Sequence, residues 1–188
     1  MSIYKLTADE LAPDILLLLV LHRTGKLREA IVRQAIKGAC WWISNGQGMG
    51  DFCDLWSTDA LALRNQKNSW HGLDLVHEHI VPRNVIEETI MQLEDLSVEK
   101  IAELLKHSRV CIVTAMEDSR LREKGLQRKL PEGSDLQGGG SDRYALAGIT
   151  LAAVSYTASD AACLPDAGSI KSKNANVDQA GRNDTGKA

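Results

Sequence analysis

The stretch His77–Arg83, which reads HEHIVPR, restricts the fold and the chemistry of this chain more than any other segment. Because side chains alternate between the two faces of a strand, His77 and His79 would share one face and Glu78 would point to the other. At a strand end or in a tight turn this rule relaxes, and Glu78 and His79 can converge on one metal-bound water. They would then supply a metal ligand beside a base, which is the pairing that metal-assisted hydrolysis needs.

Two strands and a helix are predicted around this stretch. Residues 73–81 are rich in apolar side chains and predict a strand that Pro82 ends. The apolar run Val110–Thr114 predicts a second, buried strand. A polar helix follows directly and carries Glu117 and Asp118 in its first turn, where acidic residues are favoured by the helix dipole.

The rest of the chain is predicted to be mainly helical. Thr7 and Glu10 form a capping-box pattern at the start of the first helix. Further segments are expected as helices over 9–22, 26–43, 51–65, 84–93 and 97–107, and as a glycine-containing loop over 132–142. The second helix would bury an apolar face made of Ile31, Ala35, Ala39 and Trp42. Trp41, the neighbouring tryptophan, is also expected in the core.

Composition narrows the class of protein. The chain has 188 residues, of which 44% are hydrophobic and 25% charged, as in an ordinary soluble domain. The formal net charge of -3 gives no general attraction to nucleic acid, so any such site must be a local basic patch. The apolar run over 15–21 is too short to span a bilayer. Four cysteines without a CxxC pair predict a reduced, cytoplasmic protein with buried thiols.

The chain is expected to hold one globular domain over 1–150 and a low-complexity, flexible tail over 151–188. Small and polar residues dominate the tail, and large apolar residues nearly vanish. Such a composition cannot bury enough surface to offset the entropy lost on ordering. The predicted fold class is therefore α+β and mainly helical, with a small sheet inside the domain.

Two pieces of this sequence, Glu78-His79 followed by Pro82 and the strand Val110–Thr114 with its acidic helix start, resemble the HNH family of nucleases. The family is also called His-Me finger or ββα-metal. The resemblance covers residues 73 to 131 and implies a two-stranded ββα-metal-like centre surrounded by helices. It implies that His79 is the general base and that Glu78, with Glu117 or Asp118, holds a divalent metal. Mg²⁺ or Mn²⁺ is expected with carboxylate ligands, and Zn²⁺ less so.

The function that this resemblance implies is metal-dependent hydrolysis of phosphodiester bonds by an endonuclease. The partner would be nucleic acid, with DNA as the expected form. Basic side chains would contact the phosphate backbone independently of sequence. The candidates are Arg83, Arg120, Arg122, Lys124, Arg128 and Lys129.

Two alternatives remain open. The family's helix usually presents Asn or His, and neither residue occurs between Val110 and Pro131. The chain would then be a non-catalytic regulatory or binding protein that keeps the scaffold and binds nucleic acid or a protein partner. A structural zinc site made of His77, His79 and Cys111 is the third reading. Hydrolysis predicts that the acids and His79 converge, whereas a binding protein lets them point apart or lets a basic side chain fill the metal position.

Overall fold

The computed structural model describes residues 6–46, 53–67 and 72–154. The chain divides into one unit over Met1–Ser155 and a second over Tyr156–Ala188, and the second lies wholly outside the described residues. The tail expected over 151–188 therefore falls outside them as well, apart from 151–154. Within the described part, no helix has both the length and the apolarity needed to cross a membrane.

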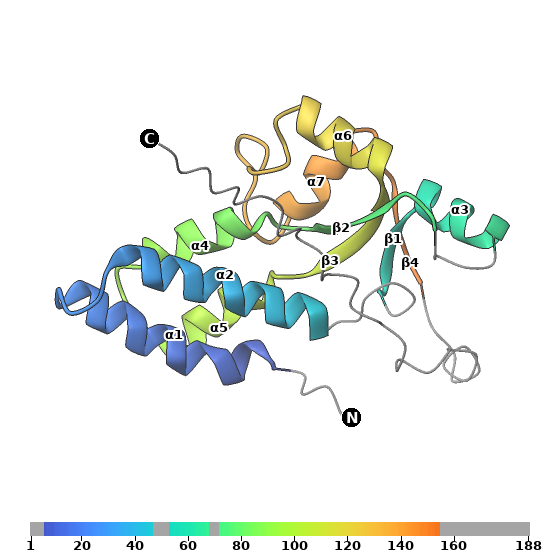
Figure 1. Cartoon of the computed structure of the whole chain (residues 1–188). Coiled ribbons are helices and arrows are strands. Elements are labelled where there is room, and N and C mark those ends of the chain that lie inside the picture. Colours follow the sequence, from blue (N-terminus) through green and yellow to red (C-terminus); the bar gives the residue numbers. More distant parts are fainter. Residues whose placement is uncertain (1–5, 47–52, 68–71, 155–188) are drawn as a thin grey trace, which may run out of the picture. The chain divides into compact units, whose positions relative to one another are not determined.

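Four helices pack around one apolar core in the first half of the fold (Figure 1). They are α1 (Ala8–Arg23), α2 (Glu29–Gly46), α4 (Arg83–Met91) and α5 (Val98–Lys106). The predicted capping box at the start of α1 is confirmed. Aliphatic side chains from all four helices are buried in the core, among them Ile15, Leu19, Val32, Ile36, Ile86, Ile90, Ile101 and Leu105.

The face that α2 turns to this core differs from the predicted one. The buried residues are Val32, Ile36, Ala39, Cys40 and Ile43. Of the predicted face only Ala39 is buried, because the true apolar stripe is rotated by one residue, about 100° around a helix with 3.6 residues per turn. Three large apolar side chains of α2 are consequently exposed: Ile31 (49%), Trp41 (46%) and Trp42 (47%).

The second half of the fold is a four-stranded mixed sheet. Its strands are β1 (Leu55–Ser57), β2 (Leu75–His79), β3 (Val110–Thr114) and β4 (Leu151–Ala153), in the order β2-β3-β1-β4. β2 pairs antiparallel with β3, β3 parallel with β1, and β1 antiparallel with β4. The α+β, mainly helical class is confirmed, while the expected two-stranded centre is part of this larger sheet.

Helices cover both faces of the sheet, as far as the chain is described. On one face, Trp56, Val110 and Ile112 pack against Ala60 of α3 (Thr58–Lys67). On the other face, the residues of β3 between them pack against α6 (Ala115–Glu123) and α7 (Gly139–Leu146) (Figure 1). Successive residues of β2 therefore alternate between the face covered by α3 and the face covered by α6 and α7.

Two predicted segments are wrong in part. The helix expected over 51–65 gives way to β1 at Leu55–Ser57, and α3 begins only at Thr58, because pairing with two strands overrides local helix propensity. The loop expected over 132–142 contains the start of α7. A Cβ atom on Gly140 would lie 2.6 Å from a methyl carbon of Ile80, so glycine allows α7 to approach the end of β2.

Candidate functional site

The two strands predicted to carry the site, β2 and β3, pair at one edge of the sheet, and the ββα-metal centre itself stays a prediction. β2 and β3 are antiparallel neighbours, and α6 follows β3 without a break. Their register pairs Glu78 with Cys111, and His79 with Val110. Directly paired residues lie on the same face of a sheet, so His79 faces the α3 side, and Glu78 faces α6 and α7. The strand alternation holds at this point, and the two side chains diverge.

The carboxylate of Glu78 is held by a buried arginine. Arg143 of α7 has no exposed surface and forms an ion pair through its Nη2 atom with Glu78 Oε1. The same guanidinium donates to the carbonyl oxygens of His79 at 2.5 Å and Leu126 at 2.7 Å, and to the hydroxyl of Tyr144 at 3.1 Å. Burial raises the pKa of Glu78, and the positive charge of Arg143 opposes this rise. A basic side chain therefore occupies the position next to Glu78 that a cation would take.

Glu117 closes a capping box and also binds the neighbouring strand. Its side chain is only 1% exposed. One carboxylate oxygen accepts hydrogen bonds from the Thr114 backbone N–H at 2.8 Å and from the Ser57 hydroxyl at 2.5 Å. The Thr114 hydroxyl in turn accepts from the Glu117 backbone N–H at 3.1 Å. These bonds tie the start of α6 to β1, which is a structural role for this acid.

Asp118 also has partners of its own. Its carboxylate accepts hydrogen bonds from Arg122 at 2.8 Å and from Gln127 at 3.4 Å. Across the ranges that the structure describes, no group of three or more His, Cys, Asp or Glu side chains is placed to hold a metal ion. The arrangement of Glu78, Glu117 and Asp118 does not amount to a preformed metal site, and their role as ligands stays a prediction.

The zinc alternative meets a similar difficulty. The Cys111 thiol donates to the Tyr144 hydroxyl at 3.1 Å. Cys111 shares the face of Glu78, whereas His77 pairs with Ile112 and lies with His79 on the opposite face. The sheet therefore separates the thiol from both imidazoles.

His79 lies in an environment that keeps its ring neutral. Its Nε2 atom is buried and has no hydrogen-bond partner within the described chain. The pKa of His79 is lowered to about 4, mainly by burial and in addition by the positive charges of Arg83 and Arg143. A general base works best when its pKa lies near the working pH, so this imidazole is a weak base at neutral pH.

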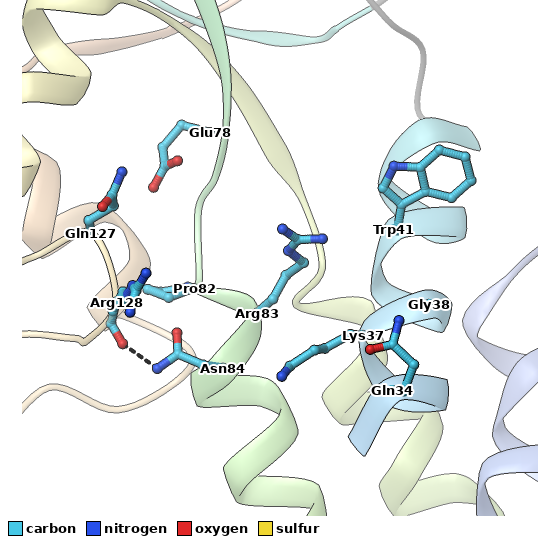
Figure 2. A pocket seen from close by; sticks show the side chains of 10 residues that line it. All are labelled: Gln34, Lys37, Gly38, Trp41, Glu78, Pro82, Arg83, Asn84, Gln127 and Arg128. Carbon is cyan, nitrogen blue, oxygen red and sulfur yellow. Dashed lines mark hydrogen bonds between the residues drawn. The ribbon is translucent and has the colours of Figure 1, made fainter. Parts of the chain in front are cut away.

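An open pocket of about 890 Å³ lies between α2 and the junction of β2 with α4. Figure 2 shows α2 on one side, Glu78 and Gln127 on the other, and the guanidinium of Arg83 between them. Three elements line it: α2 with Gln34, Lys37, Gly38 and Trp41; the β2–α4 junction with Glu78, Pro82, Arg83 and Asn84; and the segment after α6 with Gln127 and Arg128. The pocket thus joins residues from both halves of the fold.

The cations of this pocket differ in whether they are paired. Lys37 lies 3.1 Å from a carboxylate oxygen of Glu87. Arg83 and Arg128 are exposed, and neither has a carboxylate within 4.0 Å among the residues the structure describes. The side-chain amide of Asn84 donates to the Arg128 carbonyl at 2.5 Å, which attaches that segment to the start of α4. The pocket therefore carries surplus positive charge.

Only two of the six predicted phosphate contacts line this pocket, Arg83 and Arg128. Arg120 donates to the Gly148 carbonyl at 3.2 Å, and Arg122 pairs with Asp118. Lys124 and Lys129 are exposed outside the lining. The role of these four residues stays a prediction.

Among the site residues that the sequence reasoning missed are Ser57, Arg143 and Trp41. Ser57 is the last residue of β1, a three-residue strand that has no local signal of its own. Arg143 is separated from Glu78 by 65 residues, and the only local hint is an arginine beside Tyr144 after three glycines. The sequence predicts Trp41 in the core because α2 has two overlapping apolar stripes and either of them could be the buried one.

The site as a whole combines a neutral, buried imidazole, three partnered carboxylates and two unpaired guanidinium groups at an open pocket. Such a surface can bind an anion and offers few free acidic ligands to a cation. The HNH-like centre therefore stays a prediction from the sequence of 73–131. No protein-family model, no curated protein and no solved structure matches this chain.

Proposed function

We propose that this protein binds nucleic acid through the phosphate backbone and does not hydrolyse it. The binding site is the pocket between α2 and the β2–α4 junction. The observation that carries the proposal is the contrast in pairing: Arg83 and Arg128 are free of carboxylates in the described chain, while Glu78 is neutralised by Arg143. This is the non-catalytic binding reading of an HNH-like scaffold.

The chemistry of the pocket suits a phosphodiester. A guanidinium presents two parallel N–H donors to a phosphate, and charge-assisted bonds of this kind are among the strong ones. α4 begins at Arg83 in the wall of the pocket, and no side-chain hydrogen bond caps that end. The positive end of its dipole adds to the attraction for an anion. The side-chain amide of Gln34 in the pocket lining can supply a further donor.

The absence of hydrolysis is proposed from the state of the acids and of the base. Glu78 would have to release Arg143 before it could coordinate a cation. Glu117 would have to give up the cap of α6 and its bond to Ser57. A His79 with a pKa of about 4 is a poor acceptor for the proton of water at neutral pH.

A second candidate function, metal-dependent phosphodiester hydrolysis, is favoured by one observation. β2, β3 and α6 follow one another in the order that the HNH resemblance implies. In that case His79 would act on water, and Glu78 with Glu117 or Asp118 would hold Mg²⁺ or Mn²⁺. This candidate requires Arg143 to move away from Glu78 when the metal or the nucleic acid binds.

Fluorescence anisotropy with labelled oligonucleotides tests the binding proposal. The double variant Arg83→Gln/Arg128→Gln should lose about 10-fold or more in affinity at low salt, since an exposed charge pair contributes up to about 1 kcal/mol. The slope of log affinity against log salt should become shallower by about 0.7 per lost contact on a single strand. The matched control is Arg28→Gln/Arg109→Gln, which removes the same charge from exposed positions outside the pocket.

The same oligonucleotides, incubated with Mg²⁺, Mn²⁺ or EDTA, decide between the two candidates. Intact oligonucleotide under all three conditions is the expected result. Metal-dependent cleavage that disappears in His79→Ala would overturn the non-catalytic proposal. Equal loss of affinity in the pocket variant and in the control would overturn the assignment of the pocket.

A further inference from the structure

We infer that the pocket takes single-stranded nucleic acid, DNA or RNA, with one base stacked on Trp41. The inference rests on the proposed function and adds the class of strand to it. Trp41 lies on α2 in the wall of the same pocket as Arg83 and Arg128. An aromatic face and phosphate-binding cations therefore meet in one cavity, and Figure 2 shows them in one view.

The exposure of Trp41 is the first step of the argument. Its side chain is 46% exposed, although the helix that carries it buries five smaller apolar residues in the core. Leaving a large indole at the surface forgoes the apolar stabilisation that its burial would give. A ring in this position is available to cover the face of a ligand.

The neighbouring tryptophan limits the ways in which the indole can lie. Trp42 packs edge-to-face against Trp41, with ring centroids 4.9 Å apart and an interplanar angle of 79°. Contacts of this geometry stabilise a pair of rings by about 0.5–1.5 kcal/mol beyond the area they bury. Trp42 itself is outside the pocket lining, so it supports Trp41 and leaves one indole for the ligand.

The combination selects for unpaired bases. Proteins that bind single strands combine cations that follow the backbone with aromatic rings on which bases stack. In a duplex both faces of each internal base are already covered by its neighbours in the stack. The pocket volume of about 890 Å³ lies within the range of small-ligand sites of about 300–1,000 Å³, so it has room for a short run of nucleotides.

The test compares three probes of equal length: a labelled single strand, its duplex, and an abasic strand with the same phosphates and no bases. The wild-type protein should bind the single strand about 10-fold more tightly than the abasic strand, since stacking contributes on the order of 1–3 kcal/mol per base. The variant Trp41→Ala should remove this difference and leave the affinity for the abasic strand unchanged. Trp41→Phe should keep most of it.

Trp42→Ala is the matched control, because it removes an equally exposed indole that does not line the pocket. Its effect should be smaller than that of Trp41→Ala, because Trp42 contacts the other indole and does not line the pocket. If Trp41→Ala has no effect on the single strand, or weakens all three probes equally, the stacking inference is overturned while phosphate binding stands. If the wild-type protein binds none of the probes, the proposed function itself fails.

Discussion

The acidic and the basic side chains around β2, β3 and α6 differ in burial and in pairing. Glu117 is buried and hydrogen-bonded to Ser57 and Thr114, and Glu78, which lines the pocket, is held by Arg143. Arg83 and Arg128 lie in the wall of an open pocket, with no carboxylate within reach in the described chain. The two carboxylates therefore stabilise the fold, and the two guanidinium groups are available to a ligand.

This contrast shows what a short motif can and cannot indicate. An acid followed by a histidine on a strand is compatible with metal chemistry, but the same acid can serve to pair a buried guanidinium. Burial decides between the two uses, because a charge inside a protein must have a partner. Variants of these residues test whether the glutamates stabilise the fold and whether the arginines bind a ligand.

The largest effect is expected from Arg143→Met. The variant leaves Glu78 partly buried without its counter-charge, and removing one partner of a buried pair costs about 3–5 kcal/mol. Urea unfolding should show a corresponding loss in the free energy of unfolding. The control Arg122→Met changes an exposed arginine and should cost less than about 1 kcal/mol.

The double variant Glu78→Gln/Arg143→Met sharpens this measurement. Replacing the carboxylate by a neutral amide removes the uncompensated charge, so the double variant should be more stable than Arg143→Met alone. Strictly additive losses would show that the two side chains are not coupled. Such additivity would release Glu78 for the metal role that the sequence predicts.

The second effect is expected from Glu117→Ala. Without this carboxylate, the Thr114 backbone N–H and the Ser57 hydroxyl lose their acceptor in a buried place. The loss of stability should be about 3 kcal/mol, from a lost cap and an unsatisfied buried group. Glu123→Ala, at the exposed end of the same helix, should be nearly neutral.

Thermal unfolding of the Glu117 variant with EDTA and with Mg²⁺ completes this test. A structural acid destabilises the protein equally under both conditions. If Glu117→Ala is neutral in EDTA and lowers the melting temperature only relative to a metal-stabilised wild type, the acid is a ligand. The structural role assigned to Glu117 would then be wrong.

The segments with strong local signals are the ones that the sequence predicts well. The strand Val110–Thr114 has the predicted bounds, since five apolar or β-branched residues in a row favour a buried strand. Its helix begins at the predicted place because Thr114 and Glu117 form a capping box. Gly125 ends that helix with a φ of 68°, a left-handed conformation that glycine adopts without strain.

The rest depends on contacts between distant segments, which local patterns do not encode. β1 and β4 are three residues each and gain their stability from pairing across the sheet. The partner of Glu78 lies 65 residues further along the chain. For Trp41, the choice between two apolar stripes of α2 is made by the packing of α1, α4 and α5. The motif at 77–83 therefore predicts a site, while the chemistry of that site depends on these distant contacts.

A third effect concerns pH and the neutral state of His79. Because the folded-state pKa is lowered to about 4, the stabilisation is present above the unfolded pKa, near 6.5, and is lost as pH falls through 4. His77 has a lowered pKa from burial and acts in the same direction, whereas the raised pKa of Glu78 acts in the opposite one. Stability should fall between about pH 6.5 and pH 4.

The variant His79→Gln isolates the contribution of this imidazole. The variant should reduce the loss in the free energy of unfolding between pH 6.5 and 4 by on the order of 2 kcal/mol. Urea unfolding at several pH values measures this difference. His107→Gln, at the C-cap of α5, serves as the control. An unchanged pH profile in His79→Gln would mean that the ring is solvated, and the argument that it is a weak base would lose its support.

The smallest effect compares two cations of one pocket, Lys37 and Arg128. Lys37 already has a carboxylate of Glu87 at 3.1 Å, so a phosphate would gain little from it. Arg128→Gln should weaken oligonucleotide binding by about 5-fold, and Lys37→Gln by less than about 2-fold, because the pairing of Lys37 with the buried carboxylate of Glu87 leaves little net charge to attract an anion. Glu87→Gln should then release Lys37 and raise the affinity slightly. If Lys37 and Arg128 contribute equally, pairing with a carboxylate does not decide which cations bind the phosphate. Net charge near the pocket would then account for the affinity.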